Sequence, residues 1–261
     1  MKSNTYTLIT GASGGIGYDL ALLAAADGKN LVLVARTTDK LEQLAEKIRE
    51  SNSVETLVIH ADLSTESGVD KLIADINLRN IRIDTLINNA GFGDFGDFVY
   101  ADLVKNLGMI RLNISALTQL THFVLQDMLK SGSGKILNVA STAAFLPGPG
   151  MAVYYATKAY VLSFSEALTR ELKGKGISVT ALCPGPTDTG FASSAGLGKS
   201  LLHRLLPAAT SMQVAIAGYK AMQRAKAIEI PGFMNKLSAA SPRFSPRSMV
   251  RNMIYGIHKN H

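Results

Sequence analysis

Short apolar runs alternate along this chain with segments in which apolar residues recur every three or four positions. The runs predict strands over Tyr6–Thr10, Leu31–Ala35, Thr56–His60, Thr85–Asn88, Lys135–Ala140 and Ser178–Cys183, and a weaker one over Ala227–Ile230. The helical spacing covers Ile16–Ala26, Lys40–Glu50, Gly68–Leu78, Leu103–Lys130 and Val153–Leu172. Strands that alternate with helices predict an α/β fold, a doubly wound parallel sheet of about seven strands with helices on both faces.

A glycine-rich turn, TGASGGIG at residues 10–17, links the first predicted strand to the first predicted helix. Gly11 permits a tight turn, Gly15 lets the backbone approach a phosphate, and Gly17 lets the helix pack closely on the sheet. Free N–H groups at the start of the helix would face the phosphate. The turn therefore predicts a dinucleotide site that includes Gly11, Ser13, Gly14, Gly15, Ile16 and Gly17.

The residue after the second predicted strand discriminates between two dinucleotides. An acidic residue there would bind the ribose 2′-hydroxyl of NAD, but this chain has Arg36 followed by Thr37 and Thr38. A guanidinium beside hydroxyl groups suits a 2′-phosphate. We therefore predict NADP(H), bound in part by Arg36 and Thr37; the alternative is a surface arginine at the start of the next helix.

Tyr154 and Lys158 lie four residues apart in a predicted helix, so they project from one face. A nearby ammonium favours the tyrosinate, and would lower a pKa that is ordinarily about 10. Ser141 follows the strand KILNVA, from which its hydroxyl can reach a substrate oxygen. The three residues predict proton transfer at a carbonyl or alcohol, with Tyr154 as general acid/base. On spacing alone, Tyr155 as the acid and Tyr154 as an ordinary helix residue remain alternatives.

Together these motifs resemble the short-chain dehydrogenase/reductase family over nearly all of residues 5–190. The matching segments are TGASGGIG, NNAG at 88–91, Ser141, YYATK at 154–158, and CPG at 183–185 followed by Thr187 and Thr189. Within the family the chain is most similar to bacterial members that resemble hydroxysteroid dehydrogenases and long-chain ketoacyl reductases. The resemblance implies an NADP-dependent enzyme that is active as a homodimer or homotetramer.

The resemblance also implies roles for individual residues. The catalytic residues would be Tyr154, Ser141, Lys158 and Asn113, the last positioning a proton-relay water through its backbone. The cofactor contacts beyond the glycine turn and Arg36 would be Asp62, Leu63, Asn89, Ala90, Gly91, Tyr154, Lys158, Pro184, Gly185, Thr187 and Thr189. The pattern itself places Asn113 on a buried stripe with Ile110, Leu117, Leu120 and Val124, where a polar group needs a hydrogen-bond partner. A purely structural role for Asn113 is the alternative.

Length and composition favour one domain. The chain has 261 residues, 47% of them hydrophobic and 18% charged, and no Pro/Ser-rich or charged linker divides it. We expect residues 1–190 to form the core with the catalytic residues, and residues 191–261 to add a substrate-lid loop, the seventh strand and basic helices. Within that tail, Leu201–Leu206 and Ser211–Ala225 have helical spacing. The single cysteine, Cys183, excludes an internal disulfide and fits a cytoplasmic protein.

Apolar residues near the predicted chemistry suggest the substrate. Phe92, Phe95 and Phe98 follow a strand at the cofactor end, and Phe145, Leu146, Pro147 and Met151 lie between Ser141 and Tyr154. We predict an apolar or amphiphilic carbonyl substrate. We expect no metal and no nucleic-acid partner. We also expect no integral membrane segment, because no apolar run approaches the ~20 residues that a span needs.

The positive charge is concentrated in the tail. The net charge is +7, and residues 196–261 contain ten Lys or Arg against one acid, Glu229. A solvated surface explains most isolated basic residues, but a one-sided excess favours an anionic partner such as a charged carrier or a lipid surface. Two functions without turnover therefore remain as alternatives to an enzyme: a peripheral binder of anionic surfaces and an NADPH sensor.

Overall fold

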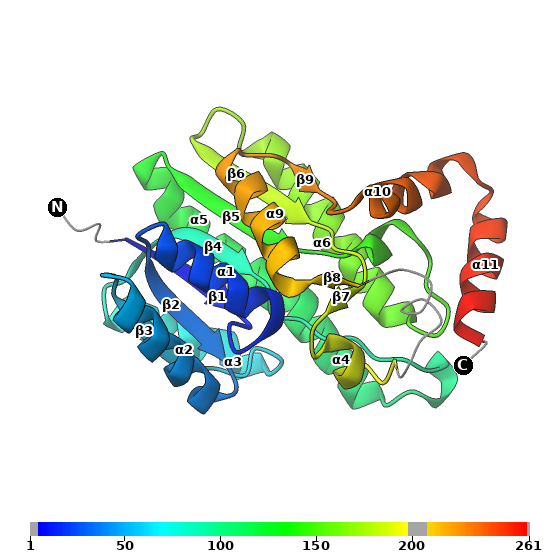
Figure 1. Ribbon diagram of the computed structural model, residues 1–261, viewed down its shortest axis with the longest axis horizontal. Helices are drawn as coiled ribbons and strands as arrows, with labels where there is room; N and C mark the ends of the chain where they lie inside the picture. The colour runs from blue at the N-terminus through cyan, green and yellow to red at the C-terminus, as the bar shows by residue number, and fades with distance from the viewer. Residues whose placement is uncertain (1–4, 198–207, 260–261) are drawn as a thin grey trace.

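Seven parallel strands form the central sheet. In the computed structural model, which describes residues 5–197 and 208–259, they are β1 (Thr5–Thr10), β2 (Asn30–Ala35), β3 (Thr56–His60), β4 (Arg82–Asn88), β5 (Gly134–Val139), β6 (Ile177–Leu182) and β9 (Ile228–Glu229). Their order is β3-β2-β1-β4-β5-β6-β9, with every neighbouring pair parallel (Figure 1). The predicted doubly wound fold is confirmed. The order reverses between β1 and β4, which is where such folds bind ligands.

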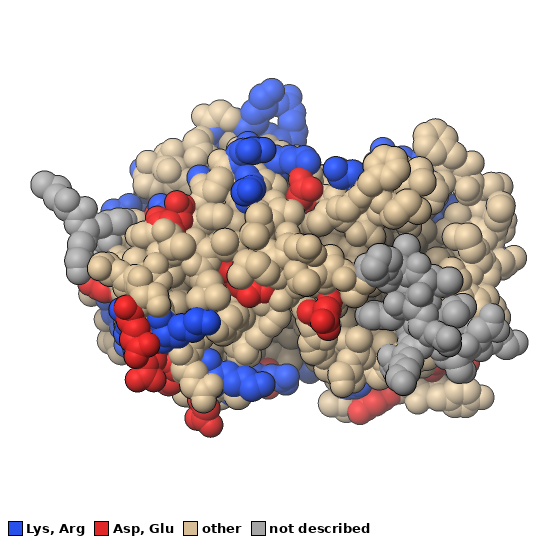
Figure 2. All heavy atoms as spheres, viewed as in Figure 1, with Lys and Arg blue, Asp and Glu red and all other residues tan. Residues whose placement is uncertain are grey.

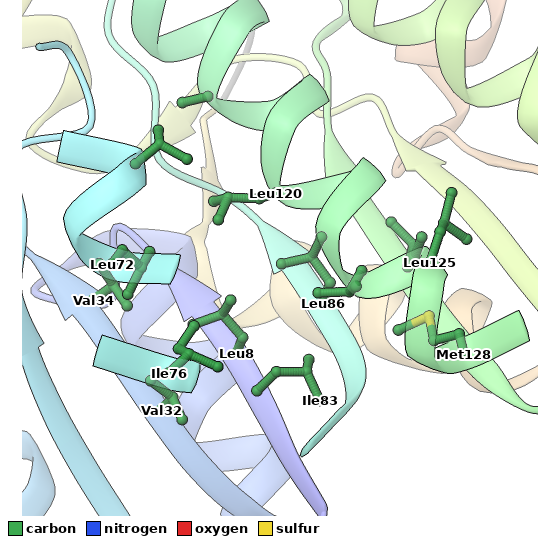
Figure 3. Close-up of a cluster of buried hydrophobic side chains, with 14 of the residues drawn as sticks. Leu8, Val32, Val34, Leu72, Ile76, Ile83, Leu86, Leu120, Leu125 and Met128 are labelled. Atoms are coloured by element: carbon green, nitrogen blue, oxygen red, sulfur yellow. The ribbon is translucent and has the colours of Figure 1, made fainter. Parts of the chain in front are cut away.

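Helices cover both faces of this sheet (Figure 1). One face packs against α1 (Gly15–Ala26), α2 (Thr38–Ser51) and α9 (Ser211–Gln223), and the other against α3 (Glu66–Leu78), α5 (Leu117–Ser131) and α6 (Ala152–Glu171). Alternate residues of the strands enter separate cores: Leu31 and Leu33 face α1 and α2, whereas Val32 and Val34 face α3. Figure 3 shows the second of these cores. The continuous apolar strands in the sequence follow from this burial on both faces.

The predicted long helix at Leu103–Lys130 is interrupted. It consists of α4 (Leu103–Ile110), a π-helical segment (Arg111–Ala116) and α5. A π-helical turn holds more residues than an α-helical one, so the buried stripe shifts around the axis. Asn113 is buried as predicted, but Ile110, predicted on the same stripe, is 37% exposed.

The tail adds elements of which the sequence predicted only some. The predicted helix at Ser211–Ala225 is α9, which starts with a capping box formed by Thr210 and Gln213. The predicted helix at Leu201–Leu206 lies outside the described residues. The short parallel pair β7 (Thr187–Asp188) and β8 (Ala209–Thr210) was not predicted, because two-residue strands show no periodicity. The remaining elements are α7 (Phe191–Ser194), α10 (Phe233–Ala240), α11 (Arg247–Lys259) and short 3₁₀ turns at Phe98–Tyr100, Thr142–Phe145 and Ser241–Phe244. Within the described ranges, no helix has both the length and the apolarity to span a bilayer.

Candidate active site

A cavity of about 660 Å³ lies beyond the carboxyl ends of the central strands. Segments that follow β1, β2, β3, β4, β5 and β6 all contribute to its wall. The cavity brings together every predicted catalytic and cofactor-binding residue except two. Gly17 and Asn113 do not line it, and both lie directly behind its wall.

The glycine turn has the backbone conformation that its sequence predicts. Gly11 and Gly15 have φ angles of +67° and +55°, in the left-handed region that favours glycine. A Cβ on Gly17 would overlap the side chain of Asn89 and the carbonyl of Gly11, so close packing requires glycine there. The Asn89 amide in turn donates to the carbonyls of Thr10 (3.0 Å) and Gly11 (3.1 Å), which fixes the turn.

This turn fits a pyrophosphate. A Cβ on Gly14 would meet no atom within 4 Å, so the backbone there borders open space in the cavity. No side chain caps the first turn of α1, which leaves its N–H groups for a ligand. The chain therefore provides an anion-binding cradle where the sequence predicts one.

Beside the cradle, the ends of β2 and β3 form a polar part of the cavity. Arg36, Thr37, Lys40 and Asp62 line this part. Burial alone would raise the pKa of Asp62, but hydrogen bonds from the Ser64 hydroxyl and amide and the charge of Arg36 leave it below its ordinary value. Sequence reasoning missed Lys40, although it lies one helical turn beyond Arg36.

Ser141, Tyr154 and Lys158 lie together in the wall of the cavity. Lys158 is buried, its Nζ donates to the carbonyl of Val139 at 2.7 Å, and this nitrogen lies 5.9 Å from the centre of the Tyr154 ring. Ser141 hydrogen-bonds the Tyr154 hydroxyl. The serine oxygen also accepts from the amide of Ala143 at 3.1 Å. The three groups therefore converge as a proton-transfer site requires.

In the nucleotide-free protein, burial outweighs the acidifying effect on Tyr154 that the sequence predicts for the Lys158 ammonium. Burial raises the pKa of Tyr154 well above its ordinary value; the hydrogen bond from Ser141 lowers it in part, and Tyr155 raises it further. Burial also lowers the pKa of Lys158 to about 8. The reason is that desolvation penalises the charged form of both groups. At neutral pH Tyr154 is therefore protonated and able to donate its proton.

Tyr155, the alternative acid, has a different environment. It also lines the cavity, and burial raises its pKa to about 12. Its ring packs on Gly148, where a Cβ would overlap it. The hydrogen bond to Ser141 and the contact with Lys158 belong to Tyr154, so the geometry favours Tyr154.

Asn113 holds the loop that covers Lys158. Its Nδ2 donates to the Phe92 carbonyl and to the Thr157 hydroxyl, both at 3.0 Å, and its Oδ1 accepts from the Phe92 amide at 3.2 Å. A Cβ on Gly91 would lie 3.0 Å from this oxygen and 3.4 Å from the Lys158 nitrogen. The side chain thus has the buried partners that the sequence pattern required, next to a predicted catalytic residue.

The rest of the cavity is largely apolar. Of the aromatic and apolar residues suggested by the sequence, Phe92, Leu146 and Met151 line it, Phe95 packs behind Tyr154, and Phe98 is 62% exposed. Phe145 packs in a separate core cluster instead. Residues from the C-terminal segment also line the cavity: Asn235, Ser238, Ser241, Met253, Ile254 and Ile257. Sequence reasoning missed this contribution, although the apolar residues of the last helix have helical spacing. Among the residues that the structure describes, no group of three or more His, Cys, Asp or Glu side chains could hold a metal ion.

Comparison with known proteins identifies the family. The family model described as short chain dehydrogenase matches residues 5–200. The chain belongs to the short-chain dehydrogenase family. A rat very-long-chain 3-oxoacyl-CoA reductase is 34% identical over 183 residues, which are 69% of this chain and 58% of that protein. The chain therefore spans little more than half the length of this relative.

Two solved structures of dehydrogenases match most of the chain. A short-chain dehydrogenase from Sphingobium yanoikuyae, solved in complex with NADPH, is 35% identical with a TM-score of 0.81, covering 92% of this chain and 94% of that one. A bulky-bulky ketone specific alcohol dehydrogenase from Comamonas testosteroni is 33% identical with a TM-score of 0.78, covering 93% and 94%. These two enzymes and the rat reductase are thus similar to this chain over most of its length, and the printed names of the rat and Comamonas proteins refer to carbonyl or alcohol substrates.

Proposed function

We propose that this protein is an NADP(H)-dependent reductase of apolar or amphiphilic carbonyl compounds, with Tyr154 as the general acid. The observation that carries the proposal is the meeting of Ser141, Tyr154 and Lys158 in the cavity that contains the glycine turn. A sensor or a surface binder would have no use for a buried tyrosine held between a serine hydroxyl and an ammonium.

In the reaction, each of the three residues acts on the substrate oxygen or on the proton that it receives. Bound NADPH would supply the hydride. Tyr154, protonated at neutral pH, donates its proton to the substrate oxygen, and the Ser141 hydroxyl hydrogen-bonds the same oxygen. Lys158, held by the Val139 carbonyl, stabilises the tyrosinate that this transfer leaves.

The preference for NADP(H) rests on charge. Arg36 and Lys40 line the cavity at the end of β2, and Thr37 adds a hydroxyl between them. Two cations favour a 2′-phosphate, and the position after β2 that selects NAD when acidic is Arg36. The NADPH complex of the Sphingobium relative supports the same choice.

The substrate class rests on the apolar part of the cavity. Phe92, Leu146, Met151 and Phe191 lie in the same cavity as Tyr154, and Met253 and Ile257 add to this surface from α11. A small hydrophilic sugar would leave these side chains without apolar contacts. The Comamonas relative, a bulky-bulky ketone specific alcohol dehydrogenase, supports a ketone too large for a small sugar site.

The test is a panel of carbonyl compounds with NADPH, followed by absorbance at the nicotinamide band. We expect turnover of medium-chain, aromatic or steroid-like ketones, and a loss of about 100-fold or more in kcat for a Tyr154→Phe protein that still binds NADPH. Tyr160→Phe is the matched control, because Tyr160 lies on the same helix, outside the cavity, with its hydroxyl 2.9 Å from that of Thr118. Binding of NADPH with no turnover of any compound would support the sensor instead, and turnover of sugars alone would contradict the substrate class.

We also propose that the protein forms a homodimer or homotetramer through the surface around α4. Exposed apolar side chains gather there in one stretch of the chain: Phe98, Val99, Tyr100, Leu103, Val104 and Leu107. Such a patch on a soluble protein is typical of an interface. Sedimentation of the protein as a monomer that Val104→Lys leaves unchanged would contradict this assembly.

A further inference from the structure

The C-terminal arm, residues 231–259 with α10 and α11, exposes many large apolar side chains. Phe244, at the turn between the two helices, is 89% exposed, and Phe233 in the first turn of α10 is 78% exposed. Met234, Leu237 and Met249 are also more than half exposed. Burying these side chains against an apolar partner would be favourable, so the arm has the character of a binding surface.

The same arm carries positive charge without any acid. Lys236, Arg243, Arg247 and Arg251 are all exposed, and none forms an ion pair with a residue that the structure describes. The last acid of the chain, Glu229, precedes the arm and is bound by Lys226 at 2.6 Å. On the side shown in Figure 2, the surface where Figure 1 places α10 and the beginning of α11 is tan with some blue, and no red is visible there.

The other side of the arm is attached to the body of the protein. Val250 and Ile254 of α11 are buried, and Ile254 also lines the cavity. The side chain of Asn235 in α10 packs on Gly185, where a Cβ would overlap it, and donates to the Pro231 carbonyl at 2.6 Å. The arm is therefore held against the body of the protein by Val250, Ile254 and Asn235, while its aromatic and basic side chains stay exposed.

We propose that this arm docks the protein on an anionic membrane surface. Exposed aromatic and apolar side chains insert at the boundary between headgroups and acyl chains, and Lys and Arg beside them meet the lipid phosphates. A second copy of the chain suits the arm less well, because two acid-free basic arms would repel and residues 1–195 have a net charge of only −2. If the substrate is apolar, as proposed above, docking would bring the cavity wall formed by α11 close to substrate dissolved in the bilayer.

Vesicle sedimentation of the full chain tests this docking without measuring turnover. The probes are vesicles of phosphatidylcholine alone and vesicles that contain about one third phosphatidylglycerol, each at low and high salt. We expect binding to the anionic vesicles that high salt weakens, and weaker binding to neutral ones. Because each cation contributes roughly a fivefold gain in partition, Arg243→Gln with Arg247→Gln should reduce partition by at least about tenfold.

Matched variants separate docking from a general effect of charge. Phe244→Ser should also reduce anionic-vesicle binding, and neither Phe244 nor the two arginines line the cavity, so turnover of a water-soluble ketone should stay unchanged. The control is Lys173→Gln with Lys175→Gln, two exposed cations beyond the end of α6 that is farther from Tyr154. Vesicle binding with no ketone turnover would sustain the docking and contradict only the reaction. The docking itself is refuted by any of three results: no binding to either vesicle at low salt, equal losses in the arm variant and the control, or a dimer that Phe244→Ser dissociates in the absence of vesicles.

Discussion

Replacing Lys158 by Met should stabilise the folded protein at neutral pH while it abolishes turnover. Lys158 is buried, and burial lowers its pKa to about 8 from the ordinary 10.5. Keeping the ammonium charged at pH 7 therefore costs the fold about 3 kcal/mol. The variant also loses the hydrogen bond from Lys158 to the Val139 carbonyl. A hydrogen bond from a charged donor stabilises a fold by about 1.5–3 kcal/mol. The net gain near pH 7 should be about 1 kcal/mol, or roughly 2–4 °C in Tm.

The difference in stability between the wild-type chain and Lys158→Met should change with pH. Because the pKa of Lys158 is lower in the folded than in the unfolded chain, the unfolded chain binds more protons between pH 8 and 10.5. The stability that Lys158 contributes is therefore present above its unfolded pKa and lost as the pH falls through 8. Between about pH 7.5 and 9.5 the wild-type chain should gain roughly 2 kcal/mol relative to Lys158→Met and become the more stable of the two.

Urea unfolding of the nucleotide-free protein across this pH range measures the difference directly, because all other titrating groups are shared by the two chains. Lys173→Met is the control, since Lys173 is exposed on the loop after α6 and should give a difference that does not vary with pH. A Lys158→Met protein that is several kcal/mol less stable at pH 7, or whose difference from wild type is flat with pH, would refute the reasoning.

Three further predictions follow from other parts of the structure. Arg36→Glu should weaken NADPH binding at least about tenfold and leave NADH binding nearly unchanged, as measured by fluorescence titration. Equal losses for the two nucleotides would show that Arg36 does not bind the 2′-phosphate. Asn138→Leu should cost about 2–4 kcal/mol in urea unfolding, because the fully buried Asn138 accepts from Asn88 at 2.9 Å and donates to Ser165 at 2.9 Å; a loss under 1 kcal/mol would mean that the network relaxes. Cys183, fully buried with its pKa raised to about 12, should not react with a thiol reagent at about pH 8 until the protein unfolds, and rapid reaction in native buffer would contradict this burial.

The fold and the cofactor cradle were predictable because their signals are local. Strands such as Leu31–Ala35 are apolar at every position, since both faces of a parallel sheet are covered, and the turn at residues 10–17 contains the glycines that its φ angles and close contacts require. The glycine turn and Arg36 were also predicted to lie together, since the carboxyl ends of neighbouring parallel strands share one edge of the sheet. The π-helical interruption at Arg111–Ala116 was not predicted. A π-helical turn shifts which residues face the core, and no residue type in the sequence signals it.

The contribution of the tail to the cavity could not be predicted, because it depends on where α10 and α11 fold back. The residues of α11 that face the body, such as Val250, Ile254 and Ile257, have helical spacing, but spacing does not say which surface they pack on. Of the five methionines in the tail, Met222 belongs to the core and Met253 lines the cavity. Amino-acid composition alone cannot predict which methionine takes which place.

The direction of the Tyr154 pKa could not be predicted for a related reason. Two residues four apart on a helix are neighbours, so sequence reasoning expects the ammonium to stabilise the tyrosinate. Burial opposes this effect for both groups at once, and only the three-dimensional structure shows how deeply Tyr154 and Lys158 are enclosed. The same burial keeps Tyr154 protonated at neutral pH and encloses the Lys158 nitrogen beside its ring. In the nucleotide-free protein the tyrosine therefore holds the proton that the proposed reduction would transfer.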